Sequence, residues 1–575
     1  MMYKTEYEKW LKEPALTEEE RTELLGFQDN DVEIAERFHG SLSFGTAGLR
    51  GIMGIGTARM NVHVIRHVSQ AFAQVILDQG LEAAHAGVVL CHDSRINSDV
   101  FAREAACVMA ANGICVRLFE GLRPTPELSF AIRHYGATAG INVTASHNPK
   151  EYNGYKVYWS DGAQLPPSLA DIVAESMAEM HMFTDVKTMD YETALKQELI
   201  TLLGTETDEL FLEKVLGQSV GRACVEQVAD TLKVVYTPFH GAGAKFVPEA
   251  LSRLGVRHIL PVWAQMEPDG NFPTVKSPNP EEPEGFALAL DVAREHEADL
   301  IIGTDPDADR VGVMVLHEGA YQMITGNQIG VLLLGYLILR KKQLGTLPEK
   351  AAFIKSIVTT EMADAVAAQY GVRAYHTFTG FKFMAEKIAA LGDRAHVFFS
   401  FEESYGYMIG DFVRDKDAVT ASMLIAEMTA WYKTRGMTLV DGLTEYYEIL
   451  GYTYVEETRS LVMPGYHGLK QMAQLMESLR TAPPREIGGQ KVIAMRDYLS
   501  GVCIEEGTRE TTMELSGSNV LYFTLADGTA FIVRPSGTEP KVKVYVLARG
   551  RDHAECEETI RQCLKFANEL REAHQ

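Results

Sequence analysis

Cysteine is scarce in this sequence, with seven residues in 575 and no C-x-x-C pair. An odd and sparse count argues against a disulfide framework and against a cysteine-rich zinc site. Long apolar runs are also lacking. The longest, IGVLLLGYLIL at 329–339, is too short to span a bilayer and predicts a buried helix. The charged N-terminus, MMYKTEYEKWLKE, has no apolar signal core, so we expect a cytoplasmic protein without a membrane partner.

Positive charge is in the minority. The 54 Lys and Arg residues face 78 Asp and Glu residues, which leaves a net charge of −24. Such a field repels phosphate polymers and argues against nucleic acid as a partner, but it permits small phosphates where a few cations gather. Neither a G-x-x-x-x-G-K-[ST] loop nor a convincing G-x-G-x-x-G is present, so nucleotide binding has little support. No obligate protein partner is evident.

Short apolar segments alternate with helix-length segments from about residue 60 to 450, which predicts α/β layers. Three of these apolar segments run directly into polar loops: INVTASHNP, LIIGTDPDADR and VFFSFEESYG. Three similar α/β units with mixed sheets, each lending a loop to a shared cleft, would explain the pattern, and coincidence is the alternative. The tail differs. Its Asp-Gly hairpin signal and a helix near 552–573 predict a small α+β domain.

Ser146 lies in the first of these loops, between Ala145 and His147. The turn formers around it predict an exposed loop, with Lys156 just inside the returning strand. A hydroxyl at such a loop tip, with a histidine and a lysine nearby, could be a nucleophile or a covalent group carrier. The alternative is a turn serine that bonds its own backbone.

The second loop, GTDPDADR at 303–310, carries three alternating aspartates. In extended backbone Asp305, Asp307 and Asp309 would project to one side, where their mutual repulsion calls for a cation. Mg²⁺ prefers such oxygen ligands. An EF-hand is excluded, because Arg310 and Leu316 stand where that loop needs glycine and an acidic residue. A solvated acidic turn is the remaining alternative.

The third loop, FEESYG at 401–406, places Glu402 and Ser404 on one side of an extended segment. A carboxylate with a hydroxyl suits vicinal sugar hydroxyls, although surface turns have the same pattern. Further polar candidates occur in HTFTGFKF and RDKDA, and they are Thr379, Gly380, Lys382 and Lys416.

Two more loops could bind phosphate. RPSGTEPK at 534–541 can surround a phosphate dianion with charge-assisted and backbone hydrogen bonds, from Arg534, Ser536, Gly537, Thr538 and Lys541. FGTAGLRG at 44–51 is rich in glycine, which permits close approach to a ligand, and Arg50 could neutralise a phosphoryl group. A tight turn with a surface arginine is the alternative for this second loop.

Taken in order, these loops resemble those of the α-D-phosphohexomutase family: FGTAGLRG, TASHNP with NGYK, DPDADR, FEES and RPSGTEPK. DGNFP and PNPE, at 269–273 and 278–281, also resemble a family loop. The stretch EESYGYMIGDFVRDKDA is most similar to the branch that contains phosphoglucomutases and phosphopentomutases. Phe401 stands where many phosphomannomutase-like members have glycine, which weakens a mannose assignment.

The resemblance implies four domains around one central cleft: α/β domains at 1–205, 206–325 and 326–455, and a C-terminal phosphate-binding lid at 456–575. It also implies an intramolecular phosphotransferase that interconverts α-D-glucose 1-phosphate and glucose 6-phosphate. Glucose 1,6-bisphosphate would be the intermediate and activator. Phosphopentomutase and phosphomannomutase activities with the same mechanism are alternatives, and sugar phosphates are the expected small-molecule partners.

By the same resemblance, Ser146 would carry the phosphoryl group, and its oxygen would bind Mg²⁺ together with Asp305, Asp307 and Asp309. Arg50 and Arg310 would neutralise the transferring group. Lys156, or less readily His147, would be the general base, and a lysine needs a depressed pKa for that role. The expected substrate-binding residues are Thr379, Gly380, Lys382, Glu402, Ser404, Lys416, Arg534, Ser536, Gly537, Thr538 and Lys541.

Two rival functions remain at this stage. In a Mg²⁺-dependent phosphatase, water would take the phosphoryl group from Ser146, but a distal phosphate grip and a sugar-binding loop help a mutase most. A silent phosphosugar-binding protein would be expected to lose Ser146 or one of the three aspartates, and all four are present.

Overall fold

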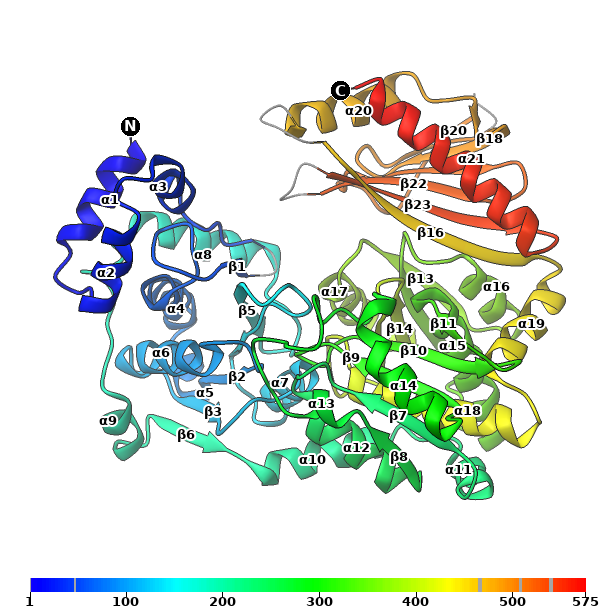
Figure 1. Ribbon diagram of the computed structural model, residues 1–575, viewed down its shortest axis with the longest axis horizontal. Helices are drawn as coiled ribbons and strands as arrows, with labels where there is room; N and C mark the ends of the chain where they lie inside the picture. Colours follow the sequence, from blue (N-terminus) through cyan, green and yellow to red (C-terminus); the bar gives the residue numbers. More distant parts are fainter. Residues whose placement is uncertain (1, 46–47, 464–467, 506–508, 537–540, 575) are drawn as a thin grey trace. The chain divides into compact units, whose positions relative to one another are not determined.

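The structure is a computed structural model that describes residues 2–45, 48–463, 468–505, 509–536 and 541–574. The chain divides into two compact units. The first comprises Met1–Ile354 and Gly380–Leu439, and the second comprises Lys355–Thr379 and Val440–Gln575. Figure 1 traces the elements of both units in sequence colours. Among the described residues, no helix is both long enough and apolar enough to cross a membrane.

Three short helices open the first unit: α1 (Met2–Lys12), α2 (Glu18–Gly26) and α3 (Asp31–Phe38). Thr17 and Glu20 form a capping box that satisfies backbone N–H groups at the start of α2. The three helices bury a small apolar cluster around Trp10 and Phe38, to which Ile55 also belongs. These three helices therefore form a small helical segment that precedes the first sheet in the chain.

The first sheet is mixed, with the strand order β1-β5-β4-β2-β3-β6. Strands β4, β2, β3 and β6 run parallel, with β6 at the edge, whereas β5 and β1 are antiparallel to their neighbours. The strands are β1 (Leu49–Ile52), β2 (Val88–His92), β3 (Val116–Phe119), β4 (Ala139–Val143), β5 (Tyr152–Trp159) and β6 (Ile200–Leu203).

Helices cover both faces of this sheet. Successive residues of a strand point to opposite sides, and in β2 the residues on both sides are apolar and buried. Val88 and Leu90 of β2 lie in one core with residues of α4, α6 and α8, whereas Val89 and Cys91 lie in a second core with α7. The helices are α4 (Val62–Leu77), α5 (Leu81–Ala86), α6 (Ser98–Ala111), α7 (Thr125–His134), α8 (Pro167–Glu179) and α9 (Tyr191–Lys196).

The second sheet has the order β11-β10-β9-β7-β8 and is also mixed. The segment from Pro261 to Pro283, with its six prolines, contains only the short helix α13 between β8 and η1. The elements are α10 (Thr205–Leu216), α11 (Arg222–Val228), β7 (Lys233–Thr237), α12 (Gly243–Leu254), β8 (His258–Pro261), α13 (Trp263–Met266), η1 (Pro283–Phe286), α14 (Ala287–His296), β9 (Leu300–Thr304), β10 (Val311–His317) and β11 (Ala320–Ile324).

A third set of α/β elements follows, and the boundary between the two units falls within it. The apolar run at 329–339 lies in α15 and is buried over most of its length, as predicted. The elements in the first unit are α15 (Gly326–Leu344), the start of β12 (Ala351–Ser356), α17 (Phe381–Leu391), η2 (Gly392–Arg394), β14 (His396–Glu402), β15 (Gly406–Ile409) and α18 (Ala418–Thr434). Those in the second unit are α16 (Met362–Gln369), β13 (Arg373–Thr377) and all but the first residue of α19 (Leu439–Leu450).

The C-terminal part is a single antiparallel sheet with helices, which confirms the predicted α+β tail. Its strand order is β16-β23-β22-β21-β18-β19-β20, with β17 paired to β18. The predicted Asp-Gly turn joins β21 to β22, and α21 packs on β16 and β23 (Figure 1). The elements are β16 (Thr453–Val462), α20 (Gly468–Thr481), β17 (Glu486–Ile487), β18 (Gln490–Asp497), β19 (Val502–Glu505), β20 (Arg509–Thr512), β21 (Leu521–Leu525), β22 (Ala530–Pro535), β23 (Lys541–Gly550) and α21 (His553–Glu572).

Candidate active site

Ser146 follows β4 and is held in a left-handed backbone conformation, with φ of 53°. Its N–H donates to Oγ1 of Thr144 at 2.8 Å, and its side chain is almost fully buried. The hydroxyl does not bond its own backbone, as a simple turn serine would. It donates instead to Oδ2 of Asp305 at 2.8 Å and lies 3.2 Å from Nδ1 of His147. The serine loop and the aspartate loop therefore meet at this hydroxyl.

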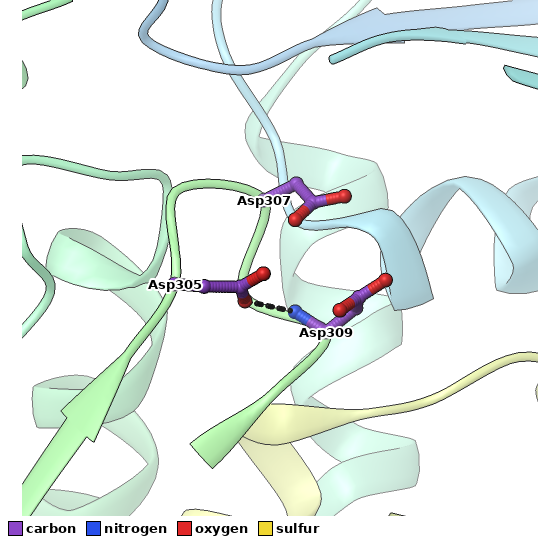
Figure 2. Close-up of side chains that lie close together, drawn as sticks. All are labelled: Asp305, Asp307 and Asp309. Atoms are coloured by element: carbon purple, nitrogen blue, oxygen red, sulfur yellow. Dashed lines mark hydrogen bonds between the residues drawn. The ribbon is translucent and has the colours of Figure 1, made fainter. Parts of the chain in front are cut away.

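Asp305, Asp307 and Asp309 converge, but not by the extended alternation expected from the sequence. Residues 305–309 form a tight turn between β9 and β10, with Ala308 at φ of 48°. Oδ1 of Asp305 closes this turn by accepting from the N–H groups of Asp309 and Arg310, each at 3.0 Å. Figure 2 shows the three carboxylates around this turn. The extended-strand prediction was wrong because the backbone reverses here.

The three carboxylates could hold a metal ion, since one ligand atom from each lies within 4.8 Å of the others. All three side chains are buried, so the alternative of a solvated acidic turn is excluded. Among the described residues, Oδ1 of Asp307 and Oδ1 of Asp309 are buried without a hydrogen-bond partner. Burial, and then the neighbouring carboxylates, raise the pKa of Asp305 well above its ordinary value. Unpaired hard oxygens of this kind fit a divalent cation such as Mg²⁺.

Two lysines neutralise part of this acidic cluster. Nζ of Lys156, in the middle of β5, lies 2.7 Å from Oδ2 of Asp307 and 3.4 Å from Oδ2 of Asp309. Nζ of Lys416 lies 3.2 Å from Oδ2 of Asp309 and 2.9 Å from Asp415. Lys416 therefore contacts the acidic cluster directly.

The pKa of Lys156 differs from the depressed value expected for a lysine base. Burial alone would lower this pKa, but the charges of Asp307 and Asp309 outweigh burial, and the pKa is raised. The ammonium group is thus held in its protonated form beside the carboxylates of Asp307 and Asp309. The expectation of a depressed pKa fails for this arrangement, because the nearest charges are two anions.

Arg310 connects the aspartate loop with the third polar loop. Its Nη1 donates to the carbonyl of Ser404 at 2.9 Å and to Oε1 of Glu281 at 3.0 Å. The residues 403–405 form the turn of the β14–β15 hairpin, with Tyr405 at φ of 63°. The prediction of an extended segment here was wrong, because Glu402 ends β14 and Ser404 lies within the turn.

Glu402 faces the start of α17 instead. Its Oε1 accepts a hydrogen bond from the N–H of Gly380 at 2.5 Å, and the side chain is buried. Burial, followed by the charge of Glu403, raises the pKa of Glu402 to about 7. Lys382 is the second residue of α17, and burial lowers its pKa. Thr379 belongs to the second unit.

Arg50 and His147 border the serine loop. The exposed side chain of Arg50, on β1, donates to Oδ1 of Asn148 at 2.8 Å. His147 is half-buried, and burial followed by the charges of Arg310 and Arg50 lowers its pKa well below the ordinary value. A neutral imidazole beside Ser146 follows from this environment.

The predicted phosphate-binding loop lies in the second unit, between β22 and β23. Arg534 is on β22, and the N–H of Ser536 donates to the carbonyl of Lys541 at 2.8 Å. Gly537 and Thr538 lie outside the described residues. The strand register places Lys543 directly opposite Arg534. Sequence reasoning missed this second cation, which lies on the same face of the sheet.

The sequence analysis also missed residues that hold the loops in place. The Arg95 guanidinium, fully buried, donates to the carbonyls of Ser146, Pro149 and Tyr152, and Asp93 accepts from Thr144. The sequence CHDSR could have indicated these residues, because it lies at the end of a buried strand, as TASHNP does. Parallel strands end at the same edge of a sheet, so the two segments are expected to lie close together. Two further residues, Thr125 and Asn142, also contact this region.

Comparison with known proteins gives a consistent result along the chain. It matches the four domain profiles of phosphoglucomutase/phosphomannomutase: alpha/beta/alpha domain I at 41–182, domain II at 211–319, domain III at 325–448 and the C-terminal domain at 490–560. The four-domain architecture expected from the loops is thereby confirmed.

Relatives and solved structures agree. The chain is 37% identical over 525 residues to a phosphoglucomutase of Staphylococcus aureus strain MRSA252, covering 90% of this chain and 92% of the relative, and 38% identical over the same length and coverage to that of strain N315. Its fold is similar to that of pp63/parafusin from Paramecium, with a TM-score of 0.67, 20% identity and coverage of 92% and 94%. It is also similar to a phosphoglucomutase/phosphomannomutase family protein from Burkholderia thailandensis, with a TM-score of 0.66, 18% identity and coverage of 93% and 97%. The chain belongs to the phosphoglucomutase/phosphomannomutase family.

Proposed function

We propose that the protein is a phosphoglucomutase that interconverts α-D-glucose 1-phosphate and glucose 6-phosphate, with Ser146 as the phosphoryl carrier. One observation carries this proposal: the buried hydroxyl of Ser146 contacts a buried cluster of three carboxylates through Asp305, at 2.8 Å. A hydroxyl placed beside a candidate metal site, with lysines and arginines around it, suits phosphoryl transfer, which depends on positioning and charge neutralisation. The names of the Staphylococcus aureus relatives support the choice of glucose phosphates.

The reaction consists of two transfers. In the first, the bond between phosphorus and Oγ of phosphorylated Ser146 breaks, and a bond forms between that phosphorus and a free sugar hydroxyl oxygen, whose proton leaves to a base. The bisphosphate then turns end for end. In the second, Oγ of Ser146 attacks the other phosphate, and the released sugar oxygen takes up a proton. Atoms and charge balance over the cycle, and Ser146 ends as it began.

A divalent cation fits the acidic cluster, and we assign it to Asp305, Asp307 and Asp309, with an oxygen of phosphorylated Ser146 as a further ligand. When bound, Mg²⁺ would act as a Lewis acid toward the phosphoryl oxygens. Arg310 and Arg50 would add positive charge at the transferring group. The raised pKa of Lys156 makes it a proton donor to the leaving sugar oxygen in one direction. To act as the base in the other direction, Lys156 must first lose its proton. Neutral His147 is the second candidate for this base.

Substrate recognition would use the polar candidates named in the sequence analysis. Glu402, Ser404, Gly380, Lys382 and Lys416 of the first unit would bind the sugar ring and its phosphates, together with Thr379. Arg534, Ser536, Gly537, Thr538 and Lys541 would grip the phosphate that does not react. Contacts of this kind must accept both orientations of glucose 1,6-bisphosphate, which we propose as intermediate and activator. We place the four domains at 1–205, 206–325, 326–455 and 456–575.

We also place the protein in the cytoplasm, where thiols stay reduced. All seven cysteines are described as free thiols, and six of them are buried. Free buried cysteines are ordinary in a reducing compartment, whereas secreted proteins usually pair them. Small sugar phosphates would be its partners.

Phosphorus NMR tests the proposal directly. The full-length protein is incubated with Mg²⁺ and a trace of glucose 1,6-bisphosphate, and glucose, mannose, glucosamine and ribose 1-phosphates are offered separately. We expect rapid formation of glucose 6-phosphate and slow conversion of the others. Faster formation of ribose 5-phosphate would identify a phosphopentomutase with the same chemistry. Release of inorganic phosphate alone would overturn the mutase proposal in favour of a phosphatase.

A further inference from the structure

Thr125, the first residue of α7, makes two hydrogen bonds to one aspartate of the acidic cluster. Its N–H donates to the backbone carbonyl of Asp307 at 2.8 Å, and its Oγ1 donates to Oδ2 of the same residue at 2.8 Å. Thr125 and Asp307 are 182 residues apart in the chain, and both are fully buried. A residue that follows β3 of the first sheet thus binds the turn that follows β9 of the second sheet.

Asn142, on β4, determines the direction of the Thr125 hydroxyl. Nδ2 of Asn142 donates to Oγ1 of Thr125 at 2.8 Å. An amide nitrogen is only a donor, so it occupies a lone pair of the hydroxyl and leaves the hydroxyl proton for Asp307. A freely rotating hydroxyl could point elsewhere. This one is oriented by a side chain from the strand that leads to Ser146.

The two oxygens of Asp307 are therefore unequal. Oδ2 accepts from Thr125 and, at 2.7 Å, from Nζ of Lys156. Oδ1 is buried and, within the described chain, has no hydrogen-bond partner. An orphaned carboxylate oxygen in a dry site is costly unless a cation completes it. The contacts to Oδ2 prevent the carboxylate from rotating to exchange its two oxygens.

We propose that Thr125 and Asn142 form a positioning pair that holds Asp307 with Oδ1 turned toward the cation, so that metal affinity depends on a hydroxyl which binds neither metal nor sugar. The inference rests on the proposed function for the existence of the metal site. Removing a residue that orients a metal ligand commonly weakens metal binding, because part of the binding energy is then spent on ordering the ligand. Thr125 is a positioning residue and not a catalytic one.

The test is a Mn²⁺ titration of the full-length protein followed by electron paramagnetic resonance, with no substrate present. Thr125→Val keeps the shape of the side chain and removes the hydroxyl, and we expect Mn²⁺ to bind about 10- to 100-fold more weakly. Thr125→Ser keeps the hydroxyl and should restore nearly the original affinity. Thr207→Val is the matched control, because Thr207 is equally buried and bonds Tyr135 away from the acidic cluster.

Unchanged Mn²⁺ affinity in Thr125→Val would overturn the inference. If that variant does not fold, Asn142→Ala decides, because it keeps the Thr125 hydroxyl and removes what orients it. We expect weaker Mn²⁺ binding there, and wild-type affinity would overturn the inference equally. A second readout is kinetic: the Mg²⁺ concentration for half-maximal rate should rise in Thr125→Val, while kcat at saturating Mg²⁺ changes less. Wild-type protein that binds Mn²⁺ but does not isomerise sugar phosphates would contradict the proposed function and leave this inference standing.

Discussion

The guanidinium of Arg95 donates a hydrogen bond of 2.6 Å to the backbone carbonyl of Ser146. The same group also bonds the carbonyls of Asn148, Pro149 and Tyr152, so one buried side chain binds the serine loop at four points. Backbone carbonyls without partners are costly when buried, and a planar guanidinium is suited to satisfy several at once. The left-handed conformation of Ser146 is thus stabilised by an arginine that takes no part in the proposed reaction.

Replacement of Arg95 by methionine should destabilise the protein strongly. The variant leaves the carbonyls of the loop unsatisfied and Asp93 buried without its cation, and breaking such a pair costs about 3–5 kcal/mol. Differential scanning calorimetry measures the effect. Arg103→Met is the control, because Arg103 is exposed and lies over the ring of Tyr191. Equal transition temperatures for the two variants would contradict the role assigned to Arg95.

Ser146→Ala should abolish turnover while the fold persists. The loss of a nucleophile that forms a covalent intermediate lowers kcat on the order of 10⁶-fold, whereas the lost hydrogen bond to Asp305 costs only about 1 kcal/mol. Mass spectrometry after incubation with glucose 1,6-bisphosphate should detect a phosphoryl group on the wild-type protein and none on the variant. A variant that retains activity, or that is phosphorylated at another residue, would rule out Ser146 as the carrier.

Glu402 should make stability depend on pH. Its pKa is raised from 4.5 to about 7, so the folded state keeps a proton that the unfolded state releases. Stability therefore falls as pH rises from about 4.5 to about 7, by up to about 3 kcal/mol. Thermal unfolding of Glu402→Gln should show a smaller decline across this range than the wild type, because the raised pKa values of Asp305 and Asp417 contribute equally in both proteins. Parallel pH profiles for the two proteins would show that Glu402 ionises normally.

Arg534→Ala should weaken substrate binding more than it lowers kcat. A hydrogen bond to a charged group contributes about 1.5–3 kcal/mol, so KM should rise about 10- to 100-fold. Steady-state kinetics with glucose 1-phosphate measures the change. Arg551→Ala serves as the control, because Arg551 is an exposed arginine of the same unit that pairs with Glu555, four residues further along the chain. The same KM in wild type and Arg534→Ala would remove this residue from the phosphate grip.

The layers of the fold could be predicted from local patterning. Apolar runs such as those of β2, β7 and β9 are buried on both faces, and they appear in the sequence as short hydrophobic segments bounded by turns. The Asp-Gly turn and the C-terminal helix were equally visible, because each depends on neighbours within a few residues. The loops that follow the strands were found for the same reason: ligand chemistry gathers at strand ends in α/β sheets.

The sequence by itself therefore determined the α/β order, the serine loop and the acidic loop as separate pieces. Only the tertiary structure decided how they meet. Ser146 reaches Asp305 across 159 residues, Lys156 reaches Asp307 across 151, and Thr125 reaches Asp307 across 182. Burial and neighbouring charge come from these distant contacts, and they set the raised pKa of Lys156 and the orphaned oxygen of Asp307. Neither property can be read from residue spacing, because both depend on which groups folding brings within a few ångströms.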